Sequence, residues 1–370
     1  TAGGNFESLV TTDTSTVTVV DTIDTTSVSL TAAPDLTEDG GNLTYTATLG
    51  SPVLAGDDPV VVSFTDLNGA ARSITITGGN ATGTYVATIP EALYEDVYSE
   101  AAADITIATN VSVAGGNFEA LGTPSVGTIA LTDSIDNTNA TLTSVGSGDE
   151  DSGSITYTVT LNNAPQADQL FSITLSNGQS ATITVASGAL TGAITFGWGA
   201  GAIAGTQALT GYPNSDAYSE APVDISVSTF TASGAGGNFE QLTPINSSTP
   251  VTIADTITPT TITLSDVNGA EGTSHTITAT VDHVVTGNDL VITLSNGKEI
   301  TIAVGATSGT SAAFAIQSDD VYVDGDAYSV GISGTAGGNF ESLVTTDTST
   351  VTVSDTLDAV TAVLTVSSNG

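Results

Sequence analysis

Short runs in which apolar and polar residues alternate recur along the whole chain, separated by Gly, Pro, Asn and Asp. Such alternation places every second side chain on one face of a strand and is typical of a half-buried β-sheet. No stretch sustains the 3.6-residue apolar period of an amphipathic helix. Thr, Val and Ile, which favour strands, are abundant. The sequence therefore predicts an all-β protein.

The first complete set of strands follows Asp24. The predicted strands are Thr26–Thr31, Leu43–Leu49, Val60–Thr65, Arg72–Thr77, Thr84–Ile89, Asp104–Asn110 and Gly127–Thr132. Seven short strands separated by turn residues indicate an immunoglobulin-like β-sandwich. Between the third and fourth strands, the pair Asn68 and Gly69 predicts a hairpin with a tight type I′ turn, because both residue types accept positive φ.

A Gly-Gly-Asn-Phe-Glu pentapeptide occurs four times, starting at Gly3, Gly115, Gly236 and Gly337. Each copy is followed by a Thr/Val-rich run and by an Asp-Thr-Ile-Asp-like tetrapeptide. The tetrapeptides are Asp21–Asp24, Asp133–Asp136, Asp255–Thr258 and Asp355–Asp358. This spacing predicts a tandem array of seven-strand sandwiches, each large enough to bury a core of its own.

The recurring segments also predict where the repeats begin and end. Residues 1–24 are expected to be the last strand and linker of a preceding repeat, 25–136 repeat 1, 137–258 repeat 2, 259–358 repeat 3, and 359–370 the start of a further repeat. Repeat 2 carries a Gly/Ala-rich insertion at 197–213 with Trp198, the one tryptophan. An exposed tryptophan could stack on a sugar ring, so a carbohydrate-binding module using Trp198 and Tyr212 is an alternative to a loop that folds onto its own domain.

The chain has 40 acidic and two basic residues and a formal net charge of −38. Ion pairing within the chain cannot balance this charge, and divalent cations are the expected counterions. The charge argues against binding nucleic acid or docking on anionic lipid, and no segment predicts membrane insertion. The absence of cysteine excludes disulfides and thiolate metal sites. Acidity that serves only solubility, as in salt-adapted proteins, is the competing interpretation.

Carboxylates recur at corresponding positions in each predicted repeat. In the expected topology, the loops after the first and fifth strands and the end of the last strand share one end of the sandwich, so they should converge where repeats meet. The predicted metal ligands are Asp21, Asp24, Glu38, Asp39, Asp96, Glu100, Glu119, Asp133, Asp136, Glu150, Asp151, Asp216, Glu220, Glu240, Asp255, Glu271, Asp320, Asp324, Glu341, Asp355 and Asp358.

Calcium is the expected ion at these joints. Ca²⁺ takes six to eight oxygen ligands in tolerant geometry, whereas Mg²⁺ requires a stricter octahedron and Zn²⁺ prefers His or Cys. The competing interpretation is a set of solvated turn residues, since Asp favours turns. At one joint Thr258 stands where the other tetrapeptides have Asp, and Pro259 follows it. This joint is expected to bind calcium more weakly than the joint at Asp133–Asp136.

Catalysis is not expected. The acidic pattern repeats in every unit, and nothing in it indicates a unique pocket with an acid and a base. His275 and His283 lie eight residues apart without a third ligand candidate nearby, so they are interpreted as surface residues.

The motifs Gly-Gly-Asn-Phe-Glu, Asp-Thr-Ile-Asp-Thr-Thr, Ile-Thr-Leu-Ser-Asn-Gly and Asp-Asp-Val-Tyr resemble the extender repeats of giant bacterial RTX adhesins, which are exported by type I secretion and mediate biofilm formation. The resemblance covers essentially the whole chain. It implies calcium-stiffened sandwiches at the bacterial cell surface that hold a distal adhesive domain away from the cell, with neighbouring repeats as partners. The chain departs from the pattern at Thr258, at Gly272 and in the insertion.

A third possibility is an extracellular filament. The segment Thr14–Val20 is a lone predicted strand, and it could complete a second copy of the chain by strand addition. The spacer, the carbohydrate-binding module and the filament subunit therefore stay open on the sequence.

Overall fold

The structure, a computed structural model, describes residues 4–199, 202, 205–234 and 236–367. The regular structure of these residues is β, apart from one short 3₁₀ helix, η1 (Glu91–Leu93). The prediction of an all-β tandem of sandwiches is confirmed. The chain divides into two compact units: unit 1 contains residues 1–138 and 238–243, and unit 2 contains residues 139–237 and 244–370.

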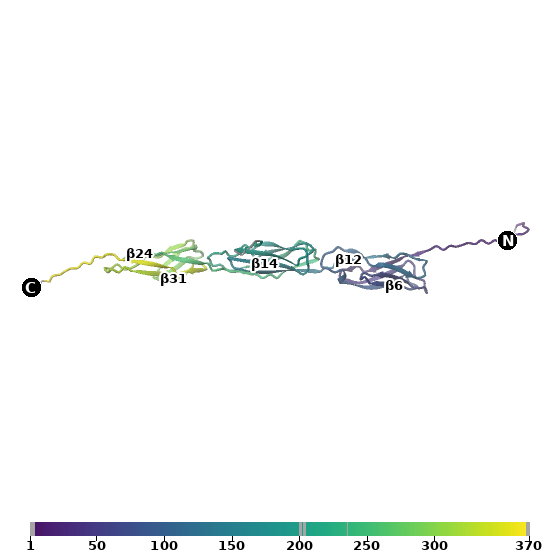
Figure 1. The fold of residues 1–370 in the computed structure, drawn as a ribbon, viewed down its shortest axis with the longest axis horizontal. Coiled ribbons are helices and arrows are strands. Elements are labelled where there is room, and N and C mark those ends of the chain that lie inside the picture. The colour runs from purple at the N-terminus through teal and green to yellow at the C-terminus, as the bar shows by residue number, and fades with distance from the viewer. Residues whose placement is uncertain (1–3, 200–201, 203–204, 235, 368–370) are drawn as a thin grey trace. The chain divides into compact units, whose positions relative to one another are not determined.

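Unit 1 has a large sheet with strand order β11-β2-β4-β3-β12-β8, in which β7 also pairs with β4. A second sheet has the order β6-β5-β9, and β1 pairs with β10. Strands β6 and β12 are labelled in Figure 1. The strands are β1 (Thr25–Thr26), β2 (Val28–Ala33), β3 (Leu36–Thr37), β4 (Gly40–Leu49), β5 (Val60–Thr65), β6 (Ala71–Ile76), β7 (Thr82–Pro90), β8 (Ala103–Thr106), β9 (Thr109–Gly115), β10 (Ala120–Leu121), β11 (Ser125–Val126) and β12 (Thr128–Thr132).

Alternation along the strands builds the core of unit 1. In β4, every second residue from Leu43 to Leu49 is buried, and these side chains pack against Val60, Val62 and Phe64 of β5. Tyr45 is fully buried, but its hydroxyl donates to the carbonyl of Ile107 at 3.0 Å. This bond satisfies the polar end of an otherwise apolar side chain, as buried tyrosines require.

Two features of unit 1 differ from the sequence prediction. The predicted strand Asp104–Asn110 is divided into β8 and β9, because β8 pairs with β12 in the large sheet while β9 pairs with β5 in the second sheet. The β5–β6 hairpin exists, but Asn68 is not among the non-glycine residues with positive φ. Its turn is closed by the Gly69 N–H to the Asp66 carbonyl at 2.9 Å, with Gly69 at φ 71°. This is a type I turn with a glycine bulge, not the expected type I′ turn.

The strands that follow are β13 (Asn137–Gly148), β14 (Ser152–Leu161), β15 (Gln169–Leu175), β16 (Ser180–Val185), β17 (Thr191–Gly199), β18 (Gln207–Ala208), β19 (Val223–Ile225), β20 (Val227–Ser233), β21 (Gln241–Asn246), β22 (Val251–Ile253), β23 (Pro259–Leu264), β24 (Val267–Ala270), β25 (Ser274–His275), β26 (Thr278–Val281), β27 (Leu290–Leu294), β28 (Glu299–Ile302), β29 (Ser308–Thr310), β30 (Phe314–Ala315), β31 (Ala327–Ala336), β32 (Ser342–Val344) and β33 (Thr348–Ser354). Their main sheets are β18-β17-β14-β13-β21, β16-β15-β20, β29-β26-β23-β32 and β24-β33-β31-β27-β28. Strands β14, β24 and β31 are labelled in Figure 1.

Trp198 is buried, which corrects the interpretation of this residue as an exposed sugar contact. Only 2% of its surface is accessible, and its indole N–H donates to the carbonyl of Asp149 at 2.7 Å. Its ring lies 5.8 Å from that of Tyr212. Part of the insertion at 197–213 lies outside the described residues. A sugar-binding role for Trp198 is not supported, because a buried ring offers no face to a ligand.

We expect Trp198→Ala to destabilise unit 2 by about 3–5 kcal/mol, because the change removes a fully packed aromatic side chain and its hydrogen bond to Asp149. Denaturant unfolding would measure the loss, with Trp198→Phe as the conservative comparison. Unfolding that is the same for wild type and Trp198→Ala would contradict the packing described here.

Candidate metal centres

Three groups of carboxylates gather in the described part of the chain. In each group the ligand atoms offered by its members lie within 4.8 Å of one another. The first group is Glu38, Glu100, Asp133 and Glu240; the second group is Glu150, Glu220, Asp255 and Glu341; the third group is Glu271, Asp324 and Asp355. Every member was among the residues predicted from the sequence as ligands.

The first group lies in unit 1, where four segments meet. Glu38 follows β3, and its N–H donates to the carbonyl of Thr132, the last residue of β12, at 3.1 Å. Asp133 comes next in the chain, and its carboxylate accepts from the N–H of Glu100 at 3.3 Å. Glu240 belongs to a pentapeptide copy, and it accepts a short hydrogen bond from the N–H of Asp136. The parallel pairing of β3 with β12 therefore places Glu38 beside Asp133.

The second group repeats this construction within unit 2. The N–H of Glu150 donates to the carbonyl of Ala254 at 2.9 Å, which places Glu150 beside Asp255. The carboxylate of Asp255 accepts from the N–H of Glu220 at 3.2 Å. Glu341, again from a pentapeptide copy, accepts a short hydrogen bond from the N–H of Thr258. The same backbone contacts thus position the same types of side chain in both groups.

The third group, in unit 2, is built on the same backbone contact but has one member fewer. The N–H of Glu271 donates to the carbonyl of Ser354, the last residue of β33, at 3.1 Å. Glu271 also accepts from the backbone N–H and the hydroxyl of Thr356, at 2.9 and 3.0 Å. Asp355 and Asp324 complete the group.

Each group contains a glutamate that is buried and only partly satisfied. Glu38, Glu150 and Glu271 are 6%, 1% and 3% exposed, and in each the Oε2 atom is buried without a hydrogen-bond partner. Further unpartnered buried oxygens belong to Asp133, Glu220, Glu240, Asp255, Glu341 and Asp355. Buried polar atoms are normally paired, and an unpaired buried carboxylate is especially unfavourable. The chemistry of each group therefore suits a cation at its centre, which would give these oxygens a partner.

The electrostatics of the first two groups disfavour the charged form of their glutamates. Burial, followed by the neighbouring carboxylates Asp133 and Glu100, raises the pKa of Glu38 to about 7. Burial is also the largest cause that raises the pKa values of the other glutamates in these groups, which are Glu100, Glu150, Glu220, Glu240 and Glu341. Each of these glutamates therefore holds its proton to a higher pH than a solvated glutamate does.

The third group behaves differently. The N–H of Thr356 lowers the pKa of Glu271, whereas desolvation raises the pKa of Asp324. Hydrogen bonds from the backbone already offset part of the charge at Glu271. At Glu271 these hydrogen bonds therefore outweigh the cost of burial.

Calcium fits the donor set. All donors are carboxylate oxygens, and the clusters contain neither His nor Cys. Ca²⁺–O distances of about 2.3–2.6 Å place opposite ligand atoms up to about 5 Å apart, so ligand atoms within 4.8 Å of one another can share one Ca²⁺. Mg²⁺ demands a near-ideal octahedron and usually keeps several waters, and Zn²⁺ would prefer nitrogen or sulfur.

Several predicted ligands lie outside the three groups and have other contacts. Asp96, Asp216 and Asp320 accept from the N–H two residues further on, at 2.7–2.9 Å, and so form turns. Asp151 accepts from the hydroxyls of Ser215 and Thr256. Glu119 accepts from the N–H of Asp24 at 2.5 Å. The remaining predicted ligands outside the groups are Asp21, Asp24, Asp39, Asp136 and Asp358.

The position of Thr258 bears on the predicted weak joint. Neither Thr258 nor the corresponding Asp136 is a member of a group; both contribute a backbone N–H to the pentapeptide glutamate. The first and second groups have the same composition, three Glu and one Asp. Thr258 therefore lies beside the second group, and the replacement of Asp by Thr at this position removes no member of the group. The weaker binding of this joint stays a prediction.

An aromatic contact that the sequence did not suggest adjoins Glu240 and Glu341, the pentapeptide glutamates of the first and second groups. The ring of Phe239 stacks on that of Tyr98 at 5.9 Å, and the ring of Phe340 stacks on that of Tyr218 at 5.7 Å. Each Phe directly precedes the glutamate that joins the group. The signal was present in the sequence as the Tyr that lies two residues before Glu100 and Glu220.

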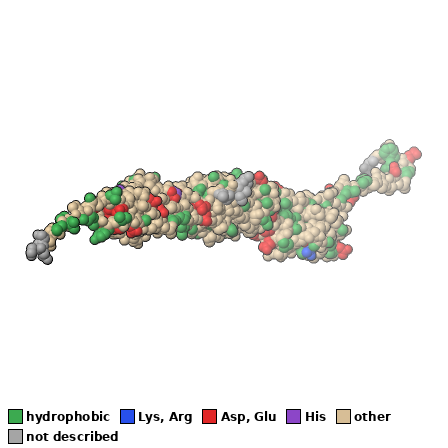
Figure 2. All heavy atoms as spheres, turned by 60° about the vertical axis from the view of Figure 1, so that its left-hand side comes forward, with side chains coloured by type: hydrophobic (Ala, Val, Ile, Leu, Met, Phe, Trp, Pro, Cys, Tyr) green, Lys and Arg blue, Asp and Glu red, His purple; other side chains and the backbone are tan. Residues whose placement is uncertain are grey.

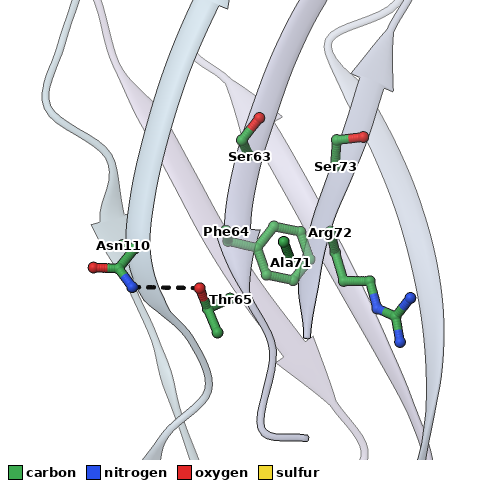
Figure 3. A pocket seen from close by; sticks show the side chains of 7 residues that line it. All are labelled: Ser63, Phe64, Thr65, Ala71, Arg72, Ser73 and Asn110. Atoms are coloured by element: carbon green, nitrogen blue, oxygen red, sulfur yellow. Dashed lines mark hydrogen bonds between the residues drawn. The ribbon is translucent and has the colours of Figure 1, made fainter. Parts of the chain in front are cut away.

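A shallow pocket on the β6-β5-β9 sheet of unit 1 offers no comparable chemistry. Figure 3 shows the side chains that line it, from β5, β6 and β9, with Asn110 donating to the Thr65 hydroxyl at 3.3 Å. The guanidinium of Arg72 is engaged by the buried Asp66 at 2.9 Å. On the face drawn in Figure 2, red acidic side chains recur while blue basic ones are scarce.

Comparison with known proteins assigns the chain to a family. The LapA domain model matches residues 24–134, 136–256 and 258–356. The chain belongs to the LapA domain family. LapA is a large bacterial adhesin, so the three matched stretches are adhesin-type repeats, which indicates a structural, surface-associated protein rather than an enzyme. No helix in the described part of this LapA-domain chain has the length and apolarity needed to cross a membrane.

A search of curated proteins finds no match for the LapA-domain chain. Among solved structures it is similar to the I9–I11 tandem of titin, with 12% identity, a TM-score of 0.19, and 91% of this chain and 98% of that chain covered. It is also similar to Escherichia coli alpha-2-macroglobulin activated by porcine elastase (9% identity, TM-score 0.18, 86% and 31% covered). A third is dimeric latent PorU from Porphyromonas gingivalis (11% identity, TM-score 0.16, 90% and 34% covered).

Proposed function

We propose that this chain is a calcium-stiffened spacer, an extender region of a large bacterial RTX surface adhesin that acts in cell attachment and biofilm formation outside the cell. The observation that carries the proposal is the recurrence of buried, unpartnered carboxylates in the carboxylate groups. Membership of the LapA domain family supports the adhesin context. A purely solvated set of turn residues would not bury Glu38 and Glu150.

The composition of the groups suggests how an ion would stiffen the chain. In the second group, Glu150, Glu220 and Asp255 lie in one matched stretch of the family, while Glu341 comes from the next. An ion bound among them would connect the two stretches, and it would hold Glu341 and the adjoining Phe340 against the preceding loop. Without the ion, mutual repulsion of the four carboxylates would oppose this contact.

Distances between two spin labels would test the stiffening within unit 2. The chain has no cysteine, so the exposed residues Ser180 and Ser308 can be changed to Cys and labelled cleanly. Pulsed dipolar measurements should give a narrow distance distribution in calcium and a broader one in EDTA. Glu341→Gln should broaden the calcium distribution, while a pair within one repeat, at Ser180 and Ser228, should not respond. Equal widths in calcium and EDTA would reject the stiffening role.

A further inference from the structure

The third carboxylate group lacks the member that completes the other two. In the first and second groups this member is a glutamate from an Asn-Phe-Glu segment, Asn238–Glu240 or Asn339–Glu341. Among the residues that the structure describes, the third group has only Glu271, Asp324 and Asp355. Its Glu271 and Asp355 nevertheless each have a buried oxygen without a partner. The third group thus has the counterparts of three members of the other groups, but not the glutamate of an Asn-Phe-Glu segment.

The loop beside the third group has an exposed surface that is covered in the other two cases. Val321, Tyr322 and Val323 are 54%, 72% and 88% exposed. The corresponding tyrosines, Tyr98 and Tyr218, are half-buried, because each stacks on the Phe of an Asn-Phe-Glu segment. The exposed surface is therefore the counterpart of a surface that carries a defined contact elsewhere in this chain.

The contact also has a recurring backbone geometry. In the first case the N–H of Ser99 donates to the carbonyl of Asn238 at 2.9 Å, and the N–H of Glu240 donates to the carbonyl of Val97 at 3.3 Å. The second case repeats both bonds at 3.2 Å, with Asn339 as the acceptor and Glu341 as the donor.

The asparagine of the docked segment has a distinctive conformation. Asn238 and Asn339 adopt φ 55° and 54°, a left-handed conformation that asparagine tolerates better than most residues. Asn117, in a pentapeptide copy that has no such contact in the described residues, is not among those with positive φ. The left-handed asparagine therefore accompanies the docked state.

We propose that the surface formed by Asp320–Asp324, together with Glu271 and Asp355, is a docking surface for the Asn-Phe-Glu segment of a further repeat of this family. The Phe of that segment stacks on Tyr322, its Asn carbonyl accepts from the N–H of Val323, and its Glu becomes the fourth carboxylate around a divalent cation. The inference rests on the proposed cation sites and deepens that function by naming the partner of the third site.

The residues that follow the third group favour this occupant. Ala362 and Leu364 stand at the same distances after Asp358 as the fully buried Ala140 and Leu142 stand after Asp136. Leu364, however, is 90% exposed. The segment after Asp358 thus has the sequence of the first strand of a repeat and would lead the chain into one.

An extended chain would test the docking. The extension keeps residues 1–364 unchanged and continues after Leu364 with a second copy of residues 143–258, which supplies Phe239 and Glu240. Amide exchange at Val323 in calcium should slow by about tenfold or more relative to the original chain, because that N–H gains a partner. The number of calcium ions bound with high affinity should rise as well.

Matched variants separate the possible outcomes. Phe239→Ala or Glu240→Gln, in the added copy only, should restore fast exchange at Val323. Fast exchange in the extended chain, with calcium still bound at the first and second groups, would overturn the docking inference alone. Absence of calcium binding at every group would overturn the proposed function. Slowing in the original chain that grows with its concentration would instead assign the surface to a second copy and overturn the proposed occupant.

Discussion

Calcium is expected to raise the unfolding temperatures of both units by roughly 5–10 °C. Extracellular calcium modules bind at about 10⁻⁴–10⁻³ M, so roughly 10 mM calcium would stabilise each site by about 1.4–2.7 kcal/mol through mass action. In a domain of about 100 residues, each kcal/mol moves the midpoint by about 4 °C or more. Calorimetry in calcium and in EDTA would measure the shift. Calcium binding at the second group should also alter the fluorescence of Trp198. The indole N–H of Trp198 donates to the carbonyl of Asp149, the residue before Glu150.

Exchange of buried glutamates for glutamine gives the control for this expectation. Glu150→Gln should stabilise the chain in EDTA, because it removes one charge from a repulsive group, and should weaken the response to calcium, because it removes a ligand. Glu299→Gln, at an exposed position of β28, should change neither result. A variant Glu150→Gln that keeps the full calcium response would exclude Glu150 as a ligand.

The sequence predicted the strands and the members of the groups for related reasons. Alternation fixes which side chains of β4 or β5 face the core, and this needs no knowledge of the tertiary contacts. The carboxylates were found because they recur at fixed positions relative to the strands. The topology then brings the ends of those strands together, as the pairing of β24 with β33 does for Glu271 and Asp355.

The sequence could not separate ligands from turn residues. Asp96 and Glu100 lie in one loop and have similar chemistry, but the carboxylate of Asp96 accepts from the N–H of Tyr98, whereas Glu100 is a member of the first group. That difference depends on side-chain direction, which residue spacing does not specify. The burial of Trp198 was equally hidden, because a Gly-rich neighbourhood suggests a loop and not a strand such as β17.

Without calcium, the stability of unit 1 is expected to fall as the pH rises from about 4.5 to about 7. Over this range an unfolded glutamate loses its proton, while burial and Asp133 keep the pKa of the folded Glu38 at about 7. The folded state therefore binds more protons than the unfolded state, and stability falls with rising pH. One pKa unit corresponds to about 1.4 kcal/mol, and the interval from pH 5 to the Glu38 pKa of about 7 covers about two such units, so a decrease in midpoint on the order of 10 °C is expected between about pH 5 and pH 8 in EDTA.

Calcium should reverse this dependence, because it binds only deprotonated carboxylates and displaces the protons that the first group otherwise retains. With calcium, the midpoint of unit 1 should therefore be higher at about pH 8 than at about pH 5. Glu38→Gln should flatten the profile in EDTA, while Glu91→Gln, at an exposed position, should leave it unchanged. A midpoint in EDTA that rises with pH over this interval would show that Glu38 is not held in a protonated, cation-deficient group.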